Sequence, residues 1–331
     1  MTPPLSDKRV VRYDPMLPGT GLFGSLGNGA RPKLDAECKF AGVVWRLRGP
    51  DRLGIPEQTL LLVLLELAEE QYGRAHETPE DCTPLEAALY SDPERRPLAD
   101  FREGVPPVLA TLSVSYSELS QRCGRTAEGG SASKQIRKEL MRLCEVTIWA
   151  VVGREEFSSR LLHWRRGDGN GVRVVLNSRL TEILIGKQYS PVSLQERLSL
   201  KSDVARALHC AMSVCIRPGG TMFFNLDTLA RHVWCEPDVA DATVRRRRQQ
   251  LRAALCEIDR MKSWTIRDRS GLKLERAERV EIWRMSRNRG GERVASPAGT
   301  PKRTIERPER PVINTAARTA EVIVDVSSLF A

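Results

Sequence analysis

A chain of 331 residues has room for about two domains of ordinary size, and a hydrophobic content of 41% is sufficient for packed cores. The formal net charge of +10 favours a polyanionic partner, although composition alone does not separate nucleic acid from an acidic membrane surface. The charge is uneven, because fifteen Lys or Arg but only six Asp or Glu lie between Val244 and Arg289. This local excess of +9 predicts a binding face in that segment.

The pattern of apolar residues and cysteines argues against several classes of protein. The N-terminus lacks the apolar core of a secretory signal, and the longest apolar run, Leu60–Leu65, is far shorter than the ~20 residues that span a membrane. The eight Cys are scattered and form no CxxC pair, which favours reduced, buried thiols over a metal site. We therefore expect a cytoplasmic protein without a membrane segment, metal or cofactor.

Residues 1–54 are rich in Gly and Pro and show little periodicity, which predicts a flexible N-terminal arm. Within this arm, residues 19–24 match the GxGxxG pattern of dinucleotide-binding loops. Such a loop needs a strand before it and a helix after it. Pro15 and Pro18 precede the match and further glycines follow it, so no dinucleotide site is predicted.

The first predicted domain covers residues 55–195. A strong helix is predicted over residues 56–72, where Leu and Ala recur at helical spacing. The Pro-rich and polar residues 74–107 are interpreted as an insertion in this domain.

The second half of this domain contains a short helix and a basic helix. Ser115 and Glu118 match a capping box, which predicts a helix over residues 116–123. After a glycine-containing turn, another helix is predicted at 132–144. Three β-type runs follow it, at 146–152, 159–164 and 172–176.

The same order of elements is predicted again in residues 196–285. An amphipathic helix at 201–216 and a short strand at 222–224 precede a helix capped by Asn225. A long basic helix at 239–258 and two paired strands, 264–267 and 278–283, complete the series. The repetition predicts a helix-rich α+β fold with two tandem winged-helix domains, each containing a helix-turn-helix.

Residues 286–331 are polar and Pro-rich, and they contain too few apolar residues to offset the entropy lost on ordering. We therefore expect a disordered C-terminal tail. Its last apolar residues, Leu329 and Phe330, are similar to the Leu-Phe peptides that dock into bacterial sliding clamps. An apolar terminus that binds no partner is the alternative.

The helix at 132–144 is a candidate for contact with DNA. Ile136, Leu140 and Leu143 fall on one face. The rest of the surface carries cationic or amide side chains: Lys134, Gln135, Arg137, Lys138 and Arg142. The second helix of a helix-turn-helix enters the major groove, where such side chains reach base edges. An ordinary surface helix explains this segment equally well, because Lys and Arg are good helix formers.

The helix at 239–258 gives a sharper signal. Its predicted buried stripe consists of Val244, Leu251, Leu255 and Ile258, and its outward side chains are Thr243, Arg245, Arg246, Gln249 and Arg252. Arg247 and Arg248 lie at the margins, where they suit phosphate contacts or packing. Four consecutive Arg repel one another, and a bound polyanion relieves that repulsion. A solvated basic helix or an acidic protein partner is the alternative, but the repeated arrangement favours DNA.

The predicted hairpins carry further cations that suit a wing. Arg160, Arg165 and Arg166 lie in the first, and Arg267, Arg269 and Lys273 lie in the second. A wing uses such residues to contact the DNA backbone or to enter the minor groove. Solvated turns also have this composition.

Motifs for catalysis are missing from the sequence. The four His are isolated, and neither a P-loop, a GxSxG motif nor an evident group of carboxylates for magnesium occurs. We therefore expect a protein that is not an enzyme.

The chain resembles the replication protein C (RepC) initiators of IncQ-type plasmids. The most specific matching run is TVRRRRQQLRAAL at 243–255, followed by Trp264-Thr265. Further matches are VRYDP at 11–15, GLF at 21–23, KLD at 33–35, ARALH at 205–209 and LDTLARHVW at 226–234. The similarity covers most of residues 9–268, whereas residues 74–107 and the tail exceed the family pattern.

This resemblance implies a plasmid replication initiator that binds direct repeats, called iterons, in double-stranded DNA at the replication origin. It implies two winged-helix domains whose DNA-reading helices are 132–144 and 239–258. It also implies that the protein opens a neighbouring AT-rich segment for a plasmid helicase and primase.

Two other functions remain open at this point. A winged-helix transcriptional repressor has the same fold and DNA footprint. A DNA-processing enzyme such as a relaxase needs a Tyr nucleophile with clustered His and a metal, and the five Tyr lie apart from the His in this sequence.

Overall fold

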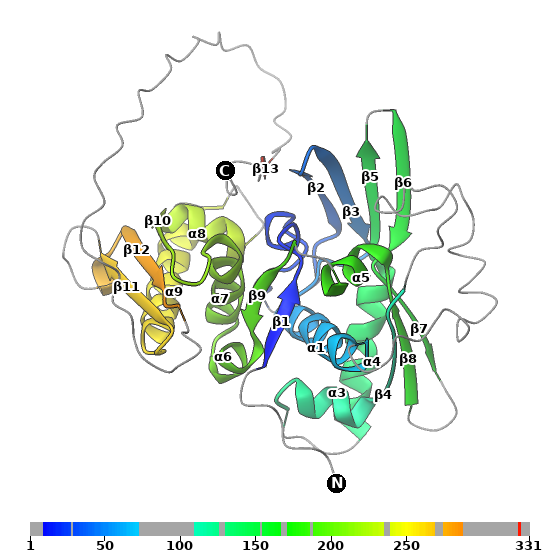
Figure 1. The fold of residues 1–331 in the computed structure, drawn as a ribbon. Coiled ribbons are helices and arrows are strands. Elements are labelled where there is room, and N and C mark those ends of the chain that lie inside the picture. Colours follow the sequence, from blue (N-terminus) through cyan, green and yellow to red (C-terminus); the bar gives the residue numbers. More distant parts are fainter. Residues whose placement is uncertain are drawn as a thin grey trace.

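A computed structural model describes residues 9–27, 29–72, 109–125, 130–152, 154–166, 171–185, 188–234, 239–268, 274–286 and 324–325. The predicted insertion at 74–107 and the side chains of Arg269, Lys273, Leu329 and Phe330 lie outside this set. Within it, helices and mostly antiparallel strands form a mixed α and β fold. Figure 1 shows the elements gathered into two groups, one from the residues before about 200 and one from the residues after it.

The first group begins with an N-terminal region and a long helix. Its elements are β1 (Val10–Tyr13), η1 (Leu17–Gly19), β2 (Leu34–Phe40), β3 (Val43–Gly49), α1 (Ile55–Tyr72), β4 (Thr111–Ser115), α3 (Tyr116–Arg122) and α4 (Gly130–Glu145). Its remaining elements are β5 (Thr147–Val152), β6 (Glu155–Arg160), β7 (Leu162–Arg166), β8 (Gly171–Leu176), α5 (Ser178–Ile185), β9 (Ser190–Ser193) and α6 (Leu194–Ser199).

The second group is smaller. It contains α7 (Asp203–Cys215), β10 (Thr221–Asn225), α8 (Leu226–Val233), α9 (Asp241–Asp259), β11 (Trp264–Asp268), η4 (Leu274–Arg276) and β12 (Arg279–Arg284). Beyond it, β13 (Val324–Asp325) pairs in parallel with β2.

One arrangement occurs in both groups. In both groups a buried helix, a strand, two helices and a hairpin occur in the same order. They are α1, β4, α3, α4, β7 and β8 in the first group, where β5 and β6 intervene after α4, and α7, β10, α8, α9, β11 and β12 in the second. The three strands form a sheet in each case, with the matching orders β4-β8-β7 and β10-β12-β11. We call the series from α1 to β8 the first unit and the series from α7 to β12 the second unit.

Two separate cores explain why each unit holds together. In the first unit, Leu60–Leu65 of α1 are fully buried and pack with Ile136, Leu140 and Leu143 of α4. In the second unit, α7 packs with Leu251, Leu255 and Ile258 of α9. Burial of this apolar area supplies most of the driving force for folding.

The predicted amphipathic helix at 201–216 is buried almost all round as α7. The prediction of a polar face was wrong because α7 packs against α8 and α9 on one side and against β9 and α6 on the other. A helix enclosed on both sides loses its solvent face, whatever its local sequence pattern.

The expected flexible arm at 1–54 was also wrong for residues 9–27 and 29–54. Strand β1 pairs with β9, and β2 and β3 form a sheet with β5 and β6. Val11, Tyr13 and Leu22 are fully buried, so these residues order the segment through contacts that are distant in sequence. No helix follows the GxGxxG match within residues 24–27 or 29–54.

The β-type run predicted at 159–164 is divided between two strands. Strand β6 belongs to the sheet with β2, β3 and β5, whereas β7 belongs to the hairpin of the first unit. Arg160 lies at the end of β6, so it is not in that hairpin.

Two features are absent from the described residues. None of the helices in that part of the chain is long and apolar enough to cross a lipid bilayer. No group of three or more His, Cys, Asp or Glu in the described ranges is arranged to hold a metal ion.

Candidate nucleic-acid interface

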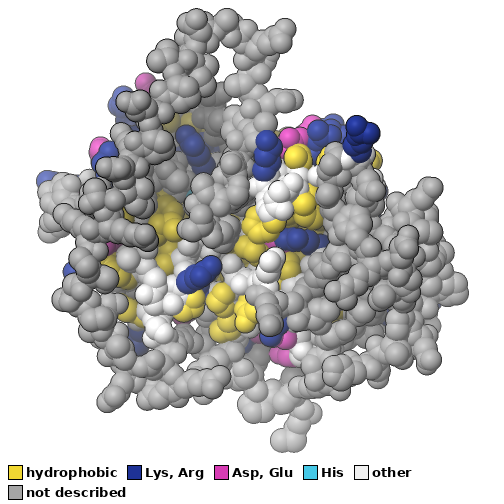
Figure 2. All heavy atoms as spheres, turned by 45° about the horizontal axis from the view of Figure 1, so that its top comes forward, with side chains coloured by type: hydrophobic (Ala, Val, Ile, Leu, Met, Phe, Trp, Pro, Cys, Tyr) yellow, Lys and Arg dark blue, Asp and Glu magenta, His cyan; other side chains and the backbone are white. Residues whose placement is uncertain are grey.

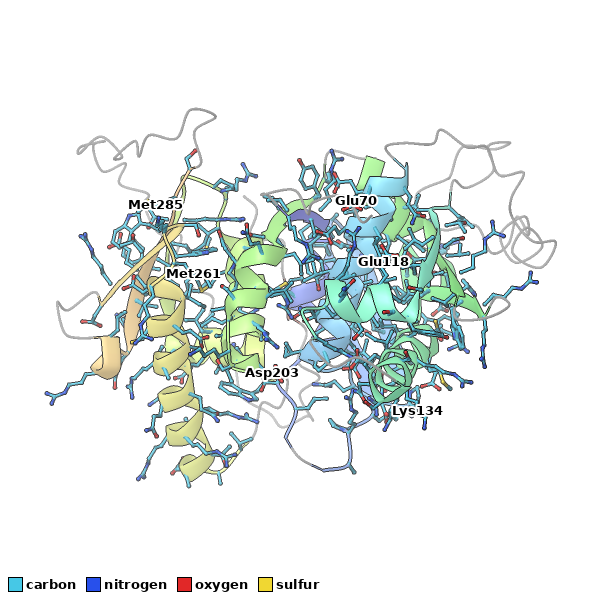
Figure 3. All side chains as sticks on the ribbon, turned by 90° about the horizontal axis from the view of Figure 1, so that it is seen from below. Glu70, Glu118, Lys134, Asp203, Met261 and Met285 are labelled. Carbon is cyan, nitrogen blue, oxygen red and sulfur yellow. The ribbon has the colours of Figure 1, made fainter. Side chains whose placement is uncertain are left out.

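Helix α9 projects from the second unit along its N-terminal half. Its C-terminal half supplies Leu251, Leu255 and Ile258 to the core, whereas Arg245, Arg246 and Gln249 are exposed. Val244, expected in the buried stripe, is only half-buried because it lies beyond the edge of the core. Figure 3 shows this end of α9 extending beyond the rest of its unit, with side chains spread around it.

The two marginal arginines of α9 are held by neighbouring residues. Arg248 donates from Nε and Nη2 to the two carboxylate oxygens of Asp227 on α8, at 2.9 and 2.8 Å. The hydrogen bond and charge of Arg248 lower the pKa of Asp227, so both groups are charged at neutral pH. The guanidinium of Arg247 stands 5.2 Å from the ring centroid of Trp234, in cation–π contact.

Arg252 and Arg267 are tied to the hairpin of the second unit. The Nε of Arg252 donates to the carbonyl of Ala277 at 2.9 Å, and the residue is half-buried. The expectation that Arg252 points outward was therefore wrong, because the hairpin covers that part of α9. Arg267 lies on β11 with its guanidinium 5.4 Å from the ring centroid of Trp283 on β12.

Helix α4 exposes a cationic face in the first unit. Lys134, Arg137 and Lys138 are exposed, and the structure gives none of them an ion pair with a described residue. Lys134 lies on the same lower side of Figure 3 as the projecting end of α9. The exposed Met141, at 42%, also lies on this helix, and the pattern of charged and amide side chains in the sequence gives no sign of it.

Two further predicted residues of α4 face acids. Gln135 Nε2 donates to Glu139 at 2.9 Å, and the buried Glu139 also accepts from Arg125 at 2.6 Å. Arg142 contacts Glu57 at 3.0 Å and Asp51 at 3.4 Å. Glu57 is fully buried, so Arg142 neutralises a core carboxylate; it is not the exposed residue that the helical pattern predicted.

Short local signals set the start of the helix that precedes α4. The hydroxyl of Ser115 accepts from the backbone N–H of Glu118 at 3.1 Å, as the capping motif predicts. The carboxylate of Glu118 instead approaches Arg122 at 3.5 Å, within the helix. In the second unit Asn225 is the N-cap of α8 by position, but its side chain makes no capping hydrogen bond.

The hairpin of the first unit keeps two of its three predicted cations and carries one that was not predicted. Arg165 and Arg166 are exposed on β7, and Arg173 lies half-buried on the neighbouring β8. Sequence reasoning missed Arg173 because it lies in the middle of an apolar strand; its cross-strand position opposite Arg165 follows only from the register. Arg160 is separate from them, and its Nη1 donates to the carbonyl of Glu145 at 2.7 Å.

The face shown in Figure 2 differs from this cationic side. Its Lys and Arg side chains lie in separate groups, several beside Asp or Glu, with hydrophobic side chains between them. Ion pairs of this kind occur on the sheet of β2, β3, β5 and β6, where Arg46 contacts Glu37 at 2.7 Å and Arg48 contacts Asp35 at 3.4 Å. Such paired cations have less charge left for a polyanion.

The exposed residues of α4 and α9 therefore form a set of hydrogen-bond donors. Guanidinium, ammonium and amide groups donate hydrogen bonds to phosphate oxygens and to the acceptor atoms of base edges. Buried cysteines do not add to this chemistry, because burial raises the pKa of Cys38 and Cys123 to about 12 and keeps both thiols protonated.

Comparisons with known proteins bear on both the family and the fold. The family model described as Replication protein C (RepC) matches residues 6–279. No curated protein sequence gives a significant match. The crystal structure of domains 2 and 3 of RctB aligns with a TM-score of 0.51 at 11% identity, covering 82% of this chain and 96% of that one.

Two further crystal structures align less closely. Selenomethionine-derivative crystals of the same RctB domains give a TM-score of 0.48 at 12% identity, covering 82% of this chain and 98% of that one. A Pi initiator protein in complex with iteron DNA gives 0.47 at 12% identity, covering 86% of this chain and all of that one, 100%. At such low identities only the similarity to RctB at 0.51 informs the fold.

Proposed function

Because the chain belongs to the Replication protein C (RepC) family of plasmid replication initiators, we propose that it binds tandem direct repeats at a replication origin through α9 and α4. The two units are, in this proposal, winged-helix domains in which α8 with α9 and α3 with α4 form the helix-turn-helix pairs. Their shared order of elements and of strands supports this assignment.

The observation that carries the proposal is the projecting N-terminal half of α9. A recognition helix contacts base edges with its N-terminal residues, and Arg245, Arg246 and Gln249 are exposed on that part of α9. Arginine reads guanine and glutamine reads adenine through paired hydrogen bonds. Arg247 and Arg248 are held at the helix margins by Trp234 and Asp227, where they suit contacts with the flanking phosphates.

Helix α4 supplies a second contact in the proposal. Its exposed cations are Lys134, Arg137 and Lys138, and Lys134 lies on the same side as the end of α9 in Figure 3. Two helices on one chain then reach successive major grooves, about 10 bp apart. Attachment to one chain raises the effective concentration of the second contact after the first has formed.

Origin opening follows from occupancy of several repeats. Copies bound side by side bend the duplex, and the strain is released where the neighbouring AT-rich steps unstack most easily. A plasmid helicase and primase then act on the unpaired strands. This function belongs in the cytoplasm, where the origin is located. Docking of the C-terminal Leu329 and Phe330 to a sliding clamp stays a prediction, because those residues lie outside the described part of the chain.

A binding experiment with the full chain tests this proposal. At physiological ionic strength the protein should bind a duplex of tandem origin repeats about 10³-fold or more tightly than random DNA. On a supercoiled origin plasmid, added protein should make thymines in the AT-rich segment reactive to permanganate. Equal affinity for random DNA contradicts the proposal. Preferential binding to an inverted repeat over a promoter instead indicates a repressor.

A further inference from the structure

The two units contain hollows in the same position but with different chemistry. In the first unit the hollow has a volume of about 530 Å³, and the side chains that line it include Ser113, Ser115, Arg165, Arg166, Arg173 and Glu118. In the second unit the equivalent hollow, of about 320 Å³, is lined by Phe223, Phe224, Asn225, Thr228 and Arg279. Both lie where the first strand of the sheet meets the start of the following helix.

Strand register explains the difference in charge. In the first unit Arg165 on β7 lies directly opposite Arg173 on β8, and Ser113 is opposite Arg173 on the other side. In the second unit the corresponding row places Arg267 opposite Glu281. Like charges directly opposite each other destabilise a sheet, whereas opposite charges stabilise it. The first unit therefore keeps a cross-strand repulsion that the second unit avoids.

Two donors near this row have no hydrogen-bond partner among the described residues. They are the Nε of Arg173, which is shielded from solvent, and the hydroxyl of the buried Tyr116. Burial raises the pKa of Tyr116, and the positive charges of Arg137 on α4 and Arg166 on β7 oppose this rise. Glu118, the one acid among the described residues that line the hollow, lies 3.5 Å from Arg122.

We propose that the hollow of the first unit, between Arg165, Arg166 and Arg173, binds a phosphodiester group of the nucleic-acid backbone. A phosphate there lies between the two opposed guanidinium groups and offsets their repulsion, so binding stabilises the sheet. The site lies beside α4 and is separate from the base-reading positions of α9. That the bound phosphate belongs to DNA rests on the proposed function. That the hollow binds an anion does not.

The first experiment uses inorganic pyrophosphate alone. Thermal unfolding of the full chain should shift upward with pyrophosphate relative to chloride at equal ionic strength. The shift should be largely lost in Arg173→Gln and in Arg165→Gln, while Arg260→Gln, at an exposed arginine beyond the end of α9, keeps it. An equal shift in all four proteins overturns the site. This readout needs no DNA, so failure of iteron binding cannot imitate its failure.

The second experiment exchanges the charge patterns of the two units. Arg173→Glu gives the first unit the opposed pair of the second, so it should raise or preserve the unfolding temperature. The same change should weaken DNA binding at least about eightfold at 0.1 M salt and lower the salt slope by about 0.9 or more. Glu281→Arg should do the reverse, lowering the unfolding temperature and steepening the salt slope. Unchanged salt slopes in both variants overturn the proposal.

Discussion

Arginines that are adjacent in the sequence make different contacts in this protein. Within Arg245–Arg248, the first two side chains are exposed at the projecting end of α9, whereas Arg247 contacts Trp234 and Arg248 pairs with Asp227. The reason is the 100° step between helical residues, which turns the last two toward α8 and its C-terminal end. Position on the helix, not residue type, therefore separates candidate base readers from residues held at the margin.

Removal of an exposed reader should change sequence preference. We expect Arg245→Ala and Gln249→Ala each to lower the preference for the origin repeat over random DNA by about 1–3 kcal/mol per lost base contact. Binding to random DNA should change much less for Gln249→Ala, since the amide carries no charge. Fluorescence anisotropy with both duplexes measures this, with Arg260→Ala as the matched control. Equal weakening on both duplexes contradicts a reading role.

Arg142 should behave as a structural residue. Its loss leaves the fully buried Glu57 with Arg31, at 2.9 Å, as the remaining cation. We expect Arg142→Ala to lower the free energy of unfolding by about 1–3 kcal/mol, less than the about 3–5 kcal/mol of an uncompensated buried charge. Urea denaturation measures the loss. The DNA affinity of the folded variant should match that of wild type. Weaker DNA binding at unchanged stability would indicate that Arg142 contacts DNA.

At the scale of elements, the short helix α6 joins the two units through adjacent residues. Glu196 accepts hydrogen bonds from Ser263 at 2.7 Å and Trp264 at 3.2 Å, both in the second unit. Arg197 is fully buried and donates to Gln58 of α1 at 2.8 Å and to the carbonyl of Arg206 at 2.6 Å. Because these bonds extend in both directions, α6 fixes the orientation of α1 against α7.

The acid sensitivity of the protein should reveal this joint. Burial alone raises the pKa of Glu196, but hydrogen bonds from His209, Ser263 and Trp264 outweigh it and lower the pKa to about 2. Burial lowers the pKa of His209, so its neutral ring donates from Nε2 to Glu196 at 3.1 Å. Between pH 4.5 and 2 the unfolded chain therefore binds a proton at Glu196 that the folded chain does not, and stability falls as the pH falls.

Substitution of Glu196 should reduce this dependence. We expect Glu196→Gln to be less stable than wild type at pH 7 but to lose less stability between pH 5 and 3; the linkage is on the order of 3 kcal/mol. Urea midpoints across that range provide the measurement. His209→Gln should instead reduce the loss that begins below pH 6.5, where the unfolded His gains its proton. Parallel pH profiles for wild type and Glu196→Gln would falsify the assignment.

At the scale of the whole molecule, two cores on one chain present two helices to solvent. The projecting end of α9 and the part of α4 that carries Lys134 lie on the same side in Figure 3. The opposite charges on the sheet of β2, β3, β5 and β6 neutralise one another. A polyanion is therefore attracted to one side of the protein more than to another.

A footprint should separate the two helices. Hydroxyl-radical cleavage of one bound repeat should show two protected regions about 10 bp apart. Lys134→Ala/Arg137→Ala/Lys138→Ala should weaken one region, and Arg245→Ala/Gln249→Ala the other, at protein concentrations that keep the site occupied. Simultaneous loss of both regions in either variant contradicts separate grooves.

The local sequence determined where most helices begin and end. The Leu run gave α1, the Ser115 cap gave the start of α3, and the apolar spacing around Ile136 and Leu251 gave α4 and α9 to within a few residues. The buried faces of α4 and of the C-terminal half of α9 also follow from that spacing. Helices are predictable in this way because their hydrogen bonds and their apolar stripe both depend on residues within one or two turns.

Only the tertiary structure decided that the N-terminal region is ordered, which strands pair, and which cations are held by acceptors. Val11 and Tyr13 are buried because β1 pairs with β9, a strand that lies far away in the sequence. Arg173 lies opposite Arg165 because of the register of β7 and β8. Arg142, Arg248 and Arg252 were similar candidates in the sequence, but Glu57, Asp227 and the carbonyl of Ala277 hold them. Whether an arginine is exposed or is held by an acceptor depends on packing between segments far apart in the chain.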